Sequence, residues 1–162
     1  MSLRTHETKT EAQESALLGV DLIARDLRSA GYSASFGNVT GVRVASAERL
    51  EVACDLNGDG DTLDANELST YSYDATKRQV MRSSGGASPQ PLVSDVPAGG
   101  LHFVYLDANG ALLGDGSGSV NGADRDRIRR VDLSLRVEIA NPDPTVSSCL
   151  ASTMTTSVAL RN

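Results

Sequence analysis

The sequence is poor in the residues on which several functions depend. It has 162 residues and no tryptophan, and aromatic residues make up 4% of it. A core must therefore be built mainly from Val, Leu, Ile and Ala, and one domain of this length can supply it. Basic residues are not in excess, since the net charge is −6. Nucleic-acid binding selects basic patches, so we expect no nucleic-acid partner.

Catalytic motifs and membrane-spanning runs are also missing. The sequence has no Gly-x-Ser-x-Gly motif, no His-Glu-x-x-His motif and no phosphate-binding glycine loop before a helix. Its two histidines are His6, near a terminus expected to fray, and His102, inside an expected strand. No apolar run is long enough to cross a bilayer. We therefore expect a soluble chain that is not an enzyme.

There are two cysteines, Cys54 and Cys149, and they do not form a Cys-x-x-Cys pair. That spacing disfavours a metal or redox centre. In an oxidising compartment they are candidates for one structural disulfide, which would close a long loop and add about 4–5 kcal/mol of stability. The alternative is two buried thiols, or one buried thiol and one idle one.

An amphipathic helix is predicted over residues 8–31. Small and apolar side chains recur there every three or four residues: Ala12, Ala16, Val20, Ile23, Ala24, Leu27 and Ala30. Gly31 can take positive φ and end the helix. Three further leucines widen the apolar stripe beyond what one sheet would bury. We expect Leu17, Leu18, Leu22 and Arg25 to contact neighbouring subunits. The alternative is a helix that packs on its own sheet and nothing else.

Alternating apolar and polar residues predict strands along the rest of the chain. The expected strands cover 42–44, 49–54, 68–74, 78–82, 91–96, 101–106, 128–140 and 153–161. The proline-flanked strand at 91–96 suits a sheet edge, and the very apolar 101–106 suits the centre. One helix followed by strands predicts an α+β fold, with the helix packed on an antiparallel sheet over 42–162. Residues 1–7 are interpreted as an expression leader and frayed helix start, and 8–162 as one domain.

The acidic segment 55–67 carries five carboxylates and no basic residue. Oxygen-bearing side chains alternate at its start, and Gly60 then permits a sharp turn, as in the first half of an EF-hand-type calcium loop. The second half departs from that pattern, because Asn66 holds the twelfth position and the glutamate comes one residue later. The predicted calcium ligands are Asp55, Asn57, Asp59, Asp61, Asp64 and Glu67. The alternative is an acidic, solvated connection between two strands.

Several of these motifs together resemble the minor pilins of type IV pili. The likeness is strongest to the PilW-like group and to the J-type minor pseudopilins of type II secretion. It is carried by the helix and tyrosine at 13–32, the acidic insertion and strand at 55–74, the segment 103–110, the strand at 129–135 and the end of the chain at 158–162.

The resemblance implies a pilin-like fold and a non-enzymatic filament subunit that acts in assembly, priming or adhesion. Its partners would be other pilin or pseudopilin subunits and the inner membrane, which an apolar helix preceding residue 8 would enter. The protein would be held in the inner membrane of a Gram-negative bacterium and then join a periplasmic or extracellular filament. Both cysteines would then lie in an oxidising space. The alternative function is a calcium-stabilised extracellular binding or adhesin module.

Overall fold

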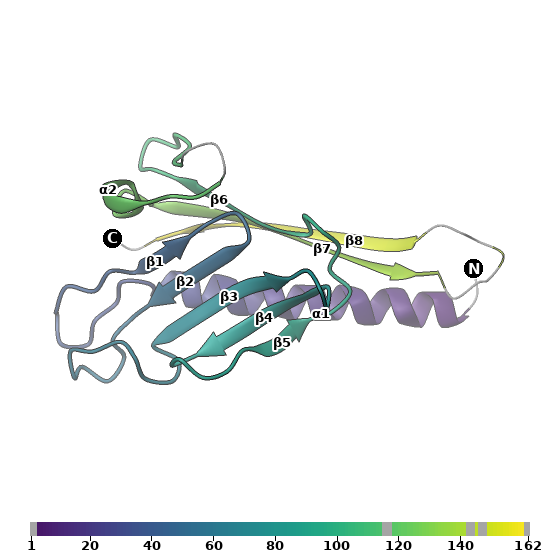
Figure 1. Cartoon of the computed structure of the whole chain (residues 1–162), viewed down its shortest axis with the longest axis horizontal. Helices are drawn as coiled ribbons and strands as arrows, with labels where there is room; N and C mark the ends of the chain where they lie inside the picture. The colour runs from purple at the N-terminus through teal and green to yellow at the C-terminus, as the bar shows by residue number, and fades with distance from the viewer. Residues whose placement is uncertain (1–2, 115–117, 142–144, 146–148, 161–162) are drawn as a thin grey trace.

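A computed structural model describes residues 3–114, 118–141, 145 and 149–160. One long helix, α1 (Leu3–Ser29), lies beside two antiparallel sheets (Figure 1). The first sheet has the order β1 (Val42–Ala45), β2 (Arg49–Ala53), β3 (Leu68–Asp74), β4 (Gln79–Ser84) and β5 (Gln90–Val93). The second contains β6 (Leu101–Leu106), β7 (Arg130–Ala140) and β8 (Cys149–Ala159). A one-turn helix, α2 (Gly122–Arg125), precedes β7.

The predicted helix is confirmed, and α1 begins at Leu3, before the predicted start at residue 8. The assignment of residues 1–7 as an expression leader remains a prediction. The apolar stripe faces the sheets, and Ala16, Ile23 and Leu27 are fully buried. Just beyond the helix, Gly31 has a φ of 82°, and its N–H donates to the carbonyl of Ala53. Positive φ at this position ends the helix and turns the chain toward β2.

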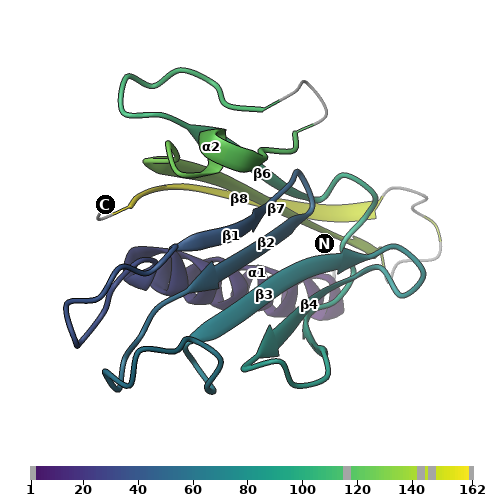
Figure 2. The ribbon, with the colours of Figure 1, turned by 60° about the vertical axis from the view of Figure 1, so that its left-hand side comes forward.

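The strands form two sheets, where the sequence predicted one. After β5, the chain turns at Asp95, which has a φ of 59°, and Pro97 follows. The next strand then pairs with β7 and not with β5. Figure 2 shows the first sheet and the second sheet as separate layers that meet along α1. Both sheets are antiparallel, so the predicted α+β class is confirmed.

The apolar strand β6 lies at an edge of its sheet, which corrects its predicted central position. Its free edge is covered instead of paired along its length. The N–H of Phe103 donates to the carbonyl of Ala47 in the β1–β2 turn, and the N–H of Leu113 donates to the carbonyl of Tyr105. Covering by other segments buries an edge strand as fully as pairing does, so its apolar composition did not reveal its place.

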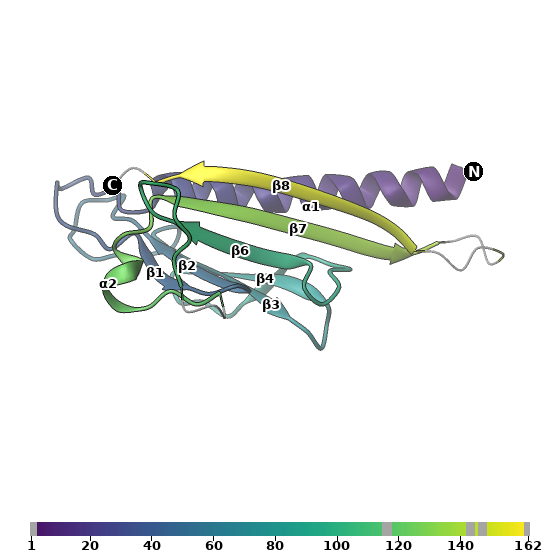
Figure 3. The same cartoon turned by 90° about the horizontal axis from the view of Figure 1, so that it is seen from above.

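The long strand β7 is the centre of the second sheet, between β6 and β8. Its alternation is confirmed: Val131, Leu133, Leu135 and Val137 are buried, and the residues between them are partly or fully exposed. Figure 3 shows β8 and α1 side by side, with β7 next to β8. As predicted, β5 lies at the edge of the first sheet. The structure also shows α2, which is one turn long and too short for periodicity to predict.

A polar cluster joins α1 to the first sheet. The hydroxyl of Tyr71 on β3 donates to the carboxylate of Asp26 on α1. Arg82 on β4 donates from Nε to the Tyr71 hydroxyl at 3.2 Å and from Nη2 to Asp26 at 3.4 Å. Burial, and then the charge of Asp26, raises the pKa of Tyr71. The sequence offered no signal for this cluster, because its members are far apart in the chain.

Candidate metal site and exposed helix face

The acidic loop connects β2 to β3, and its first residue organises its neighbours. Asp55 is buried. Its Oδ1 accepts from the N–H of Gly58 at 2.7 Å, and its Oδ2 accepts from the hydroxyls of Ser33 and Ser35, each at 3.2 Å. Burial acts to raise the pKa of Asp55, but these hydrogen bonds outweigh it and lower the pKa. Asp55 is not one of the four carboxylates that lie together, and its predicted role as a calcium ligand stays a prediction.

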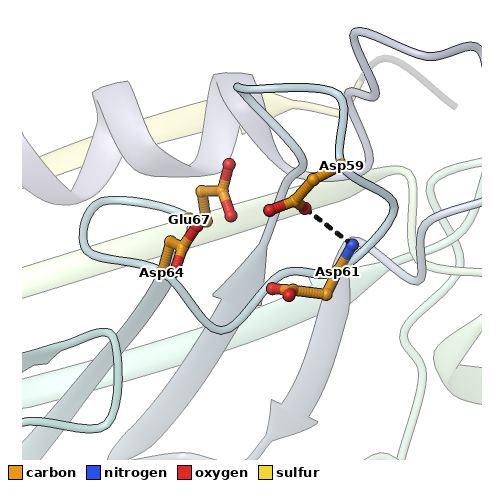
Figure 4. A group of neighbouring side chains, drawn as sticks. All are labelled: Asp59, Asp61, Asp64 and Glu67. Atoms are coloured by element: carbon orange, nitrogen blue, oxygen red, sulfur yellow. Dashed lines mark hydrogen bonds between the residues drawn. The ribbon is translucent and has the colours of Figure 1, made fainter.

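Four of the predicted ligands do come together. Asp59, Asp61, Asp64 and Glu67 each place a carboxylate oxygen within 4.8 Å of those of the other three. Figure 4 shows these side chains around a common space. Calcium binds oxygen ligands at about 2.3–2.6 Å, so two ligands on opposite sides of the ion lie about 5 Å apart. The spacing is therefore compatible with the size of a calcium ion.

Alternate side chains curl the backbone of the loop. The N–H of Asp59 donates to Oδ1 of Asn57 at 2.9 Å, that of Asp61 to Oδ1 of Asp59 at 3.0 Å, and that of Leu63 to Oδ1 of Asp61 at 2.9 Å. Asp and Asn favour such turns, because their side chains can bond to the backbone two residues ahead. The Nδ2 of Asn57 donates to Asp59 and to Asp64. Asn57 thus lies beside the cluster with its amide nitrogen toward the carboxylates, and its role as a calcium ligand stays a prediction.

Glu67 reaches the cluster despite coming one residue later than the EF-hand pattern requires. Asn66 has a φ of 69°, and this left-handed turn accommodates the extra residue. Glu67 is 3% exposed, and its Oε1 accepts from the N–H groups of Leu56 at 2.8 Å and Asn57 at 3.1 Å. Its Oε2 is buried and has no hydrogen-bond partner in the described part of the chain. A buried carboxylate oxygen without a donor, beside three further carboxylates, is an arrangement that could hold a metal ion.

The carboxylates of the loop have no basic partner within the part of the chain that the structure describes. Among the ion pairs of the described residues, none includes a carboxylate of residues 55–67. The nearby Arg43 donates to the hydroxyl of Thr62 instead. Two like charges at about 4–5 Å repel by about 1 kcal/mol even in bulk water. A bound cation would remove this repulsion for all four carboxylates at once.

The cysteines are free, so the predicted disulfide is not formed. Cys54 is buried directly after β2, and its N–H donates to the carbonyl of Glu67. Cys149 is exposed and begins β8, where it pairs with Ala140. Leu160, which follows β8, shares a surface pocket with Gly41, and the Gly41 carbonyl accepts from Ala53. Cys54 therefore lies near the far end of β8.

The length of β8 is the physical reason that the two thiols do not meet. The strand has 11 residues. At about 3.3 Å per residue, it separates its ends by over 30 Å, whereas a disulfide needs Cα atoms within about 7 Å.

Burial, and then the negative charge of Glu67, raises the pKa of the Cys54 thiol.

Three of the four predicted contact residues are exposed on α1. Leu17 is 48% exposed and Leu18 is 69% exposed, and Arg25 is also exposed. Leu22 is half-buried. Among the described residues, no helix is long and apolar enough to span a membrane. The role of these side chains as subunit contacts stays a prediction.

One solved structure is similar over nearly the whole chain. It is the type IV-like pilin TTHA1219 from Thermus thermophilus, with a TM-score of 0.53 and 15% sequence identity. The match covers 91% of this chain and 96% of that one. The chain has a type IV pilin-like fold. No protein-family model and no curated protein sequence matches it. The pilin-like fold is thus established. The resemblance to the PilW-like and J-type groups stays a prediction.

Proposed function

We propose that the protein is a non-enzymatic minor subunit of a type IV pilus or of a type II secretion pseudopilus, related to the PilW-like or J-type subunits. It is held in the inner membrane before assembly and then joins a periplasmic or extracellular filament, where it acts in assembly, priming or adhesion. The pilin-like fold supports this function. The observation that carries it is the pair of exposed leucines in the middle of α1.

The outer face of α1 has the properties of an interface. Full burial of a leucine side chain is worth about 1.5–3 kcal/mol. With exposures of 48% and 69%, Leu17 and Leu18 would together gain about 2–3.5 kcal/mol when a neighbour covers them. Clustered exposed apolar residues mark interaction sites.

Charge on the same helix favours an axial offset between neighbouring copies. The exposed Glu11 and Glu14 lie toward its N-terminal end, and the exposed Arg25 and Arg28 lie toward its C-terminal end. If one helix is displaced along another, acidic and basic segments come side by side. Such complementarity sets register and orientation.

The test uses the full-length protein expressed from its natural gene. We expect Leu17→Ser with Leu18→Ser to abolish incorporation into filaments, measured by immunogold electron microscopy and by cross-linking of a cysteine placed at Asp21. The covered half of Leu17 is worth about 0.8–1.5 kcal/mol by the same measure, so unfolding in urea is used to check that the double variant remains folded. The matched control is Leu112→Ser, because Leu112 is 72% exposed on the loop after β6. Normal incorporation of the double variant would refute the proposal.

We also propose, as a second function, that the acidic loop binds calcium and makes the protein a calcium-stabilised extracellular module. The unpartnered Oε2 of Glu67 beside Asp59, Asp61 and Asp64 favours it. Extracellular calcium sites have dissociation constants of about 0.1–1 mM. At 10 mM calcium, such a site adds about 1.4–2.7 kcal/mol of stability, which raises the melting temperature by about 3–10 °C.

The matched variant is Asp59→Asn. Asparagine keeps the Oδ1 that accepts from Asp61 and removes the charge, so the turn remains while the affinity falls. Calorimetry should show calcium binding to the wild type and much weaker binding to the variant. Magnesium should give a smaller thermal shift. An absence of heat and of thermal shift at 10 mM calcium would eliminate the metal site.

A further inference from the structure

The segment between α1 and β1 depends on one residue of the acidic loop. Apart from the N–H of Tyr32, which donates to the carbonyl of Ser29 at the end of α1, every hydrogen bond of the described structure that leaves residues 32–37 ends on Asp55. Asp55 donates its N–H to the carbonyl of Tyr32 at 2.8 Å and accepts from the N–H of Ala34 at 2.9 Å. Its Oδ2 also accepts from Ser33 and Ser35. We call residues 32–37 the connector.

The connector has little apolar contact to hold it otherwise. Residues 34–37 are exposed, and Phe36 is 97% exposed with a φ of 59°. The N–H groups of Phe36 and Gly37 donate to Ser33 inside the connector itself. Segments with few buried contacts open locally at a low free-energy cost. The position of Asp55 therefore decides whether the connector stays on the domain.

The position of Asp55 depends in turn on Glu67. The Oε1 of Glu67 accepts from Leu56 and Asn57, the two residues that follow Asp55. The N–H of Cys54, the residue before it, donates to the carbonyl of Glu67. Asp55 is thus held on both sides by one glutamate, whose Oε2 has no partner among the described residues. Glu67 belongs to the acidic cluster.

We infer that a calcium ion bound by Asp59, Asp61, Asp64 and Glu67 fixes the connector against the domain through Asp55. Without the ion, mutual repulsion of the four carboxylates opens the loop and releases residues 32–37 with the aromatic side chain of Phe36. With the ion, the Oε2 of Glu67 gains its partner and the loop closes. This inference rests on the proposed calcium binding. It adds that the occupancy of the calcium site controls whether the connector stays bound to the domain.

The effect of calcium on the opening of the connector follows from thermodynamic linkage between binding and opening. If the connector opens only when the ion has left, its open fraction falls by the factor 1 + [Ca²⁺]/Kd. For a dissociation constant of about 0.1–1 mM, 10 mM calcium lowers the open fraction about 10- to 100-fold. Hydrogen exchange of the Ala34 and Asp55 amides should slow by the same factor, because both amides are bonded across the contact. The Gly110 amide, bonded to Asp107 in another loop, is the internal control.

The experiment measures amide exchange by NMR on the chain of 162 residues, with and without 10 mM calcium chloride, beside calorimetry of calcium binding. We expect slower exchange at Ala34 and Asp55 and no change at Gly110. In Asp59→Asn, calcium should slow neither amide. In the double variant Ser33→Ala with Ser35→Ala, calcium should still bind, but protection of Ala34 should fall severalfold, because two of the bonds to Asp55 are gone.

The two proposals fail differently. If calorimetry shows calcium binding and the Ala34 and Asp55 amides exchange at an unchanged rate, coupling to the connector is refuted and the metal site stands. If calorimetry shows no binding, both are refuted. Equal protection in the wild type and in the Ser33 and Ser35 double variant also overturns the route through Asp55.

Discussion

Gly19 lies in the middle of α1, where glycine is normally unfavourable, and its position tests how the first sheet packs on the helix. It is buried, and a Cβ added to it would lie 2.5 Å from Cγ2 of Val93 on β5. Real Cβ atoms do not approach other atoms so closely. Val93 is itself buried and β-branched, so it cannot rotate away freely. The glycine lets β5 approach the helix backbone.

Two opposing effects set the result of Gly19→Ala. Alanine favours the helix over glycine by about 1 kcal/mol. The added methyl overpacks the contact with Val93, which costs about 1–3 kcal/mol. We therefore expect a net loss of about 0–2 kcal/mol in the wild-type background. In a Val93→Ala background the clash is absent, so the same substitution should stabilise the protein by about 1 kcal/mol.

The assay is a double-mutant cycle, with unfolding in urea followed by circular dichroism at 222 nm. The expected coupling between residues 19 and 93 is about 1–3 kcal/mol, which is well above the additivity error of about 0.5 kcal/mol. A gain of about 1 kcal/mol from Gly19→Ala in both backgrounds would refute the reasoning. It would mean that β5 does not press on α1 at this residue.

Other predictions concern the rest of the helix contact and the buried tyrosines. Asp26→Ala removes the acceptor of Tyr71 and Arg82, and it should cost about 2–3 kcal/mol in urea unfolding, with Asp26→Asn costing less. Leu27→Ala empties a fully buried site and should cost about 2–5 kcal/mol, whereas Leu18→Ala on the exposed face should stay within about 0.5 kcal/mol. Burial raises the pKa of Tyr71 and of Tyr105, so both ionise more readily in the unfolded chain. Their contribution to stability is complete below about pH 10 and is lost as the pH rises further. The melting temperature should therefore fall above about pH 10. Absorbance at 295 nm should show that both tyrosines ionise only when the protein unfolds.

The local pattern of residues determined much of this protein. The apolar spacing from Ala12 to Ala30 predicted α1, and the alternation of β7 predicted which of its side chains are buried. The acidic spacing predicted the loop in which Asp59, Asp61, Asp64 and Glu67 converge. These features depend on residues close together in the chain, where helix and strand periods and side chain-to-backbone turns decide the geometry.

The tertiary structure decided what joins distant segments. Alternation of apolar and polar residues indicates that a strand is buried on one face, but it does not indicate which strand pairs with it. The division into two sheets and the edge position of β6 therefore appeared only in the fold. A disulfide between Cys54 and Cys149 was suggested only because the chain has two cysteines. The length of β8 keeps them apart. The bonds of Asp55 to Ser33 and Ser35, and the buried Oε2 of Glu67 that has no partner among the described residues, appeared only in the fold. Long-range packing sets these distances, and no pattern in neighbouring residues records them.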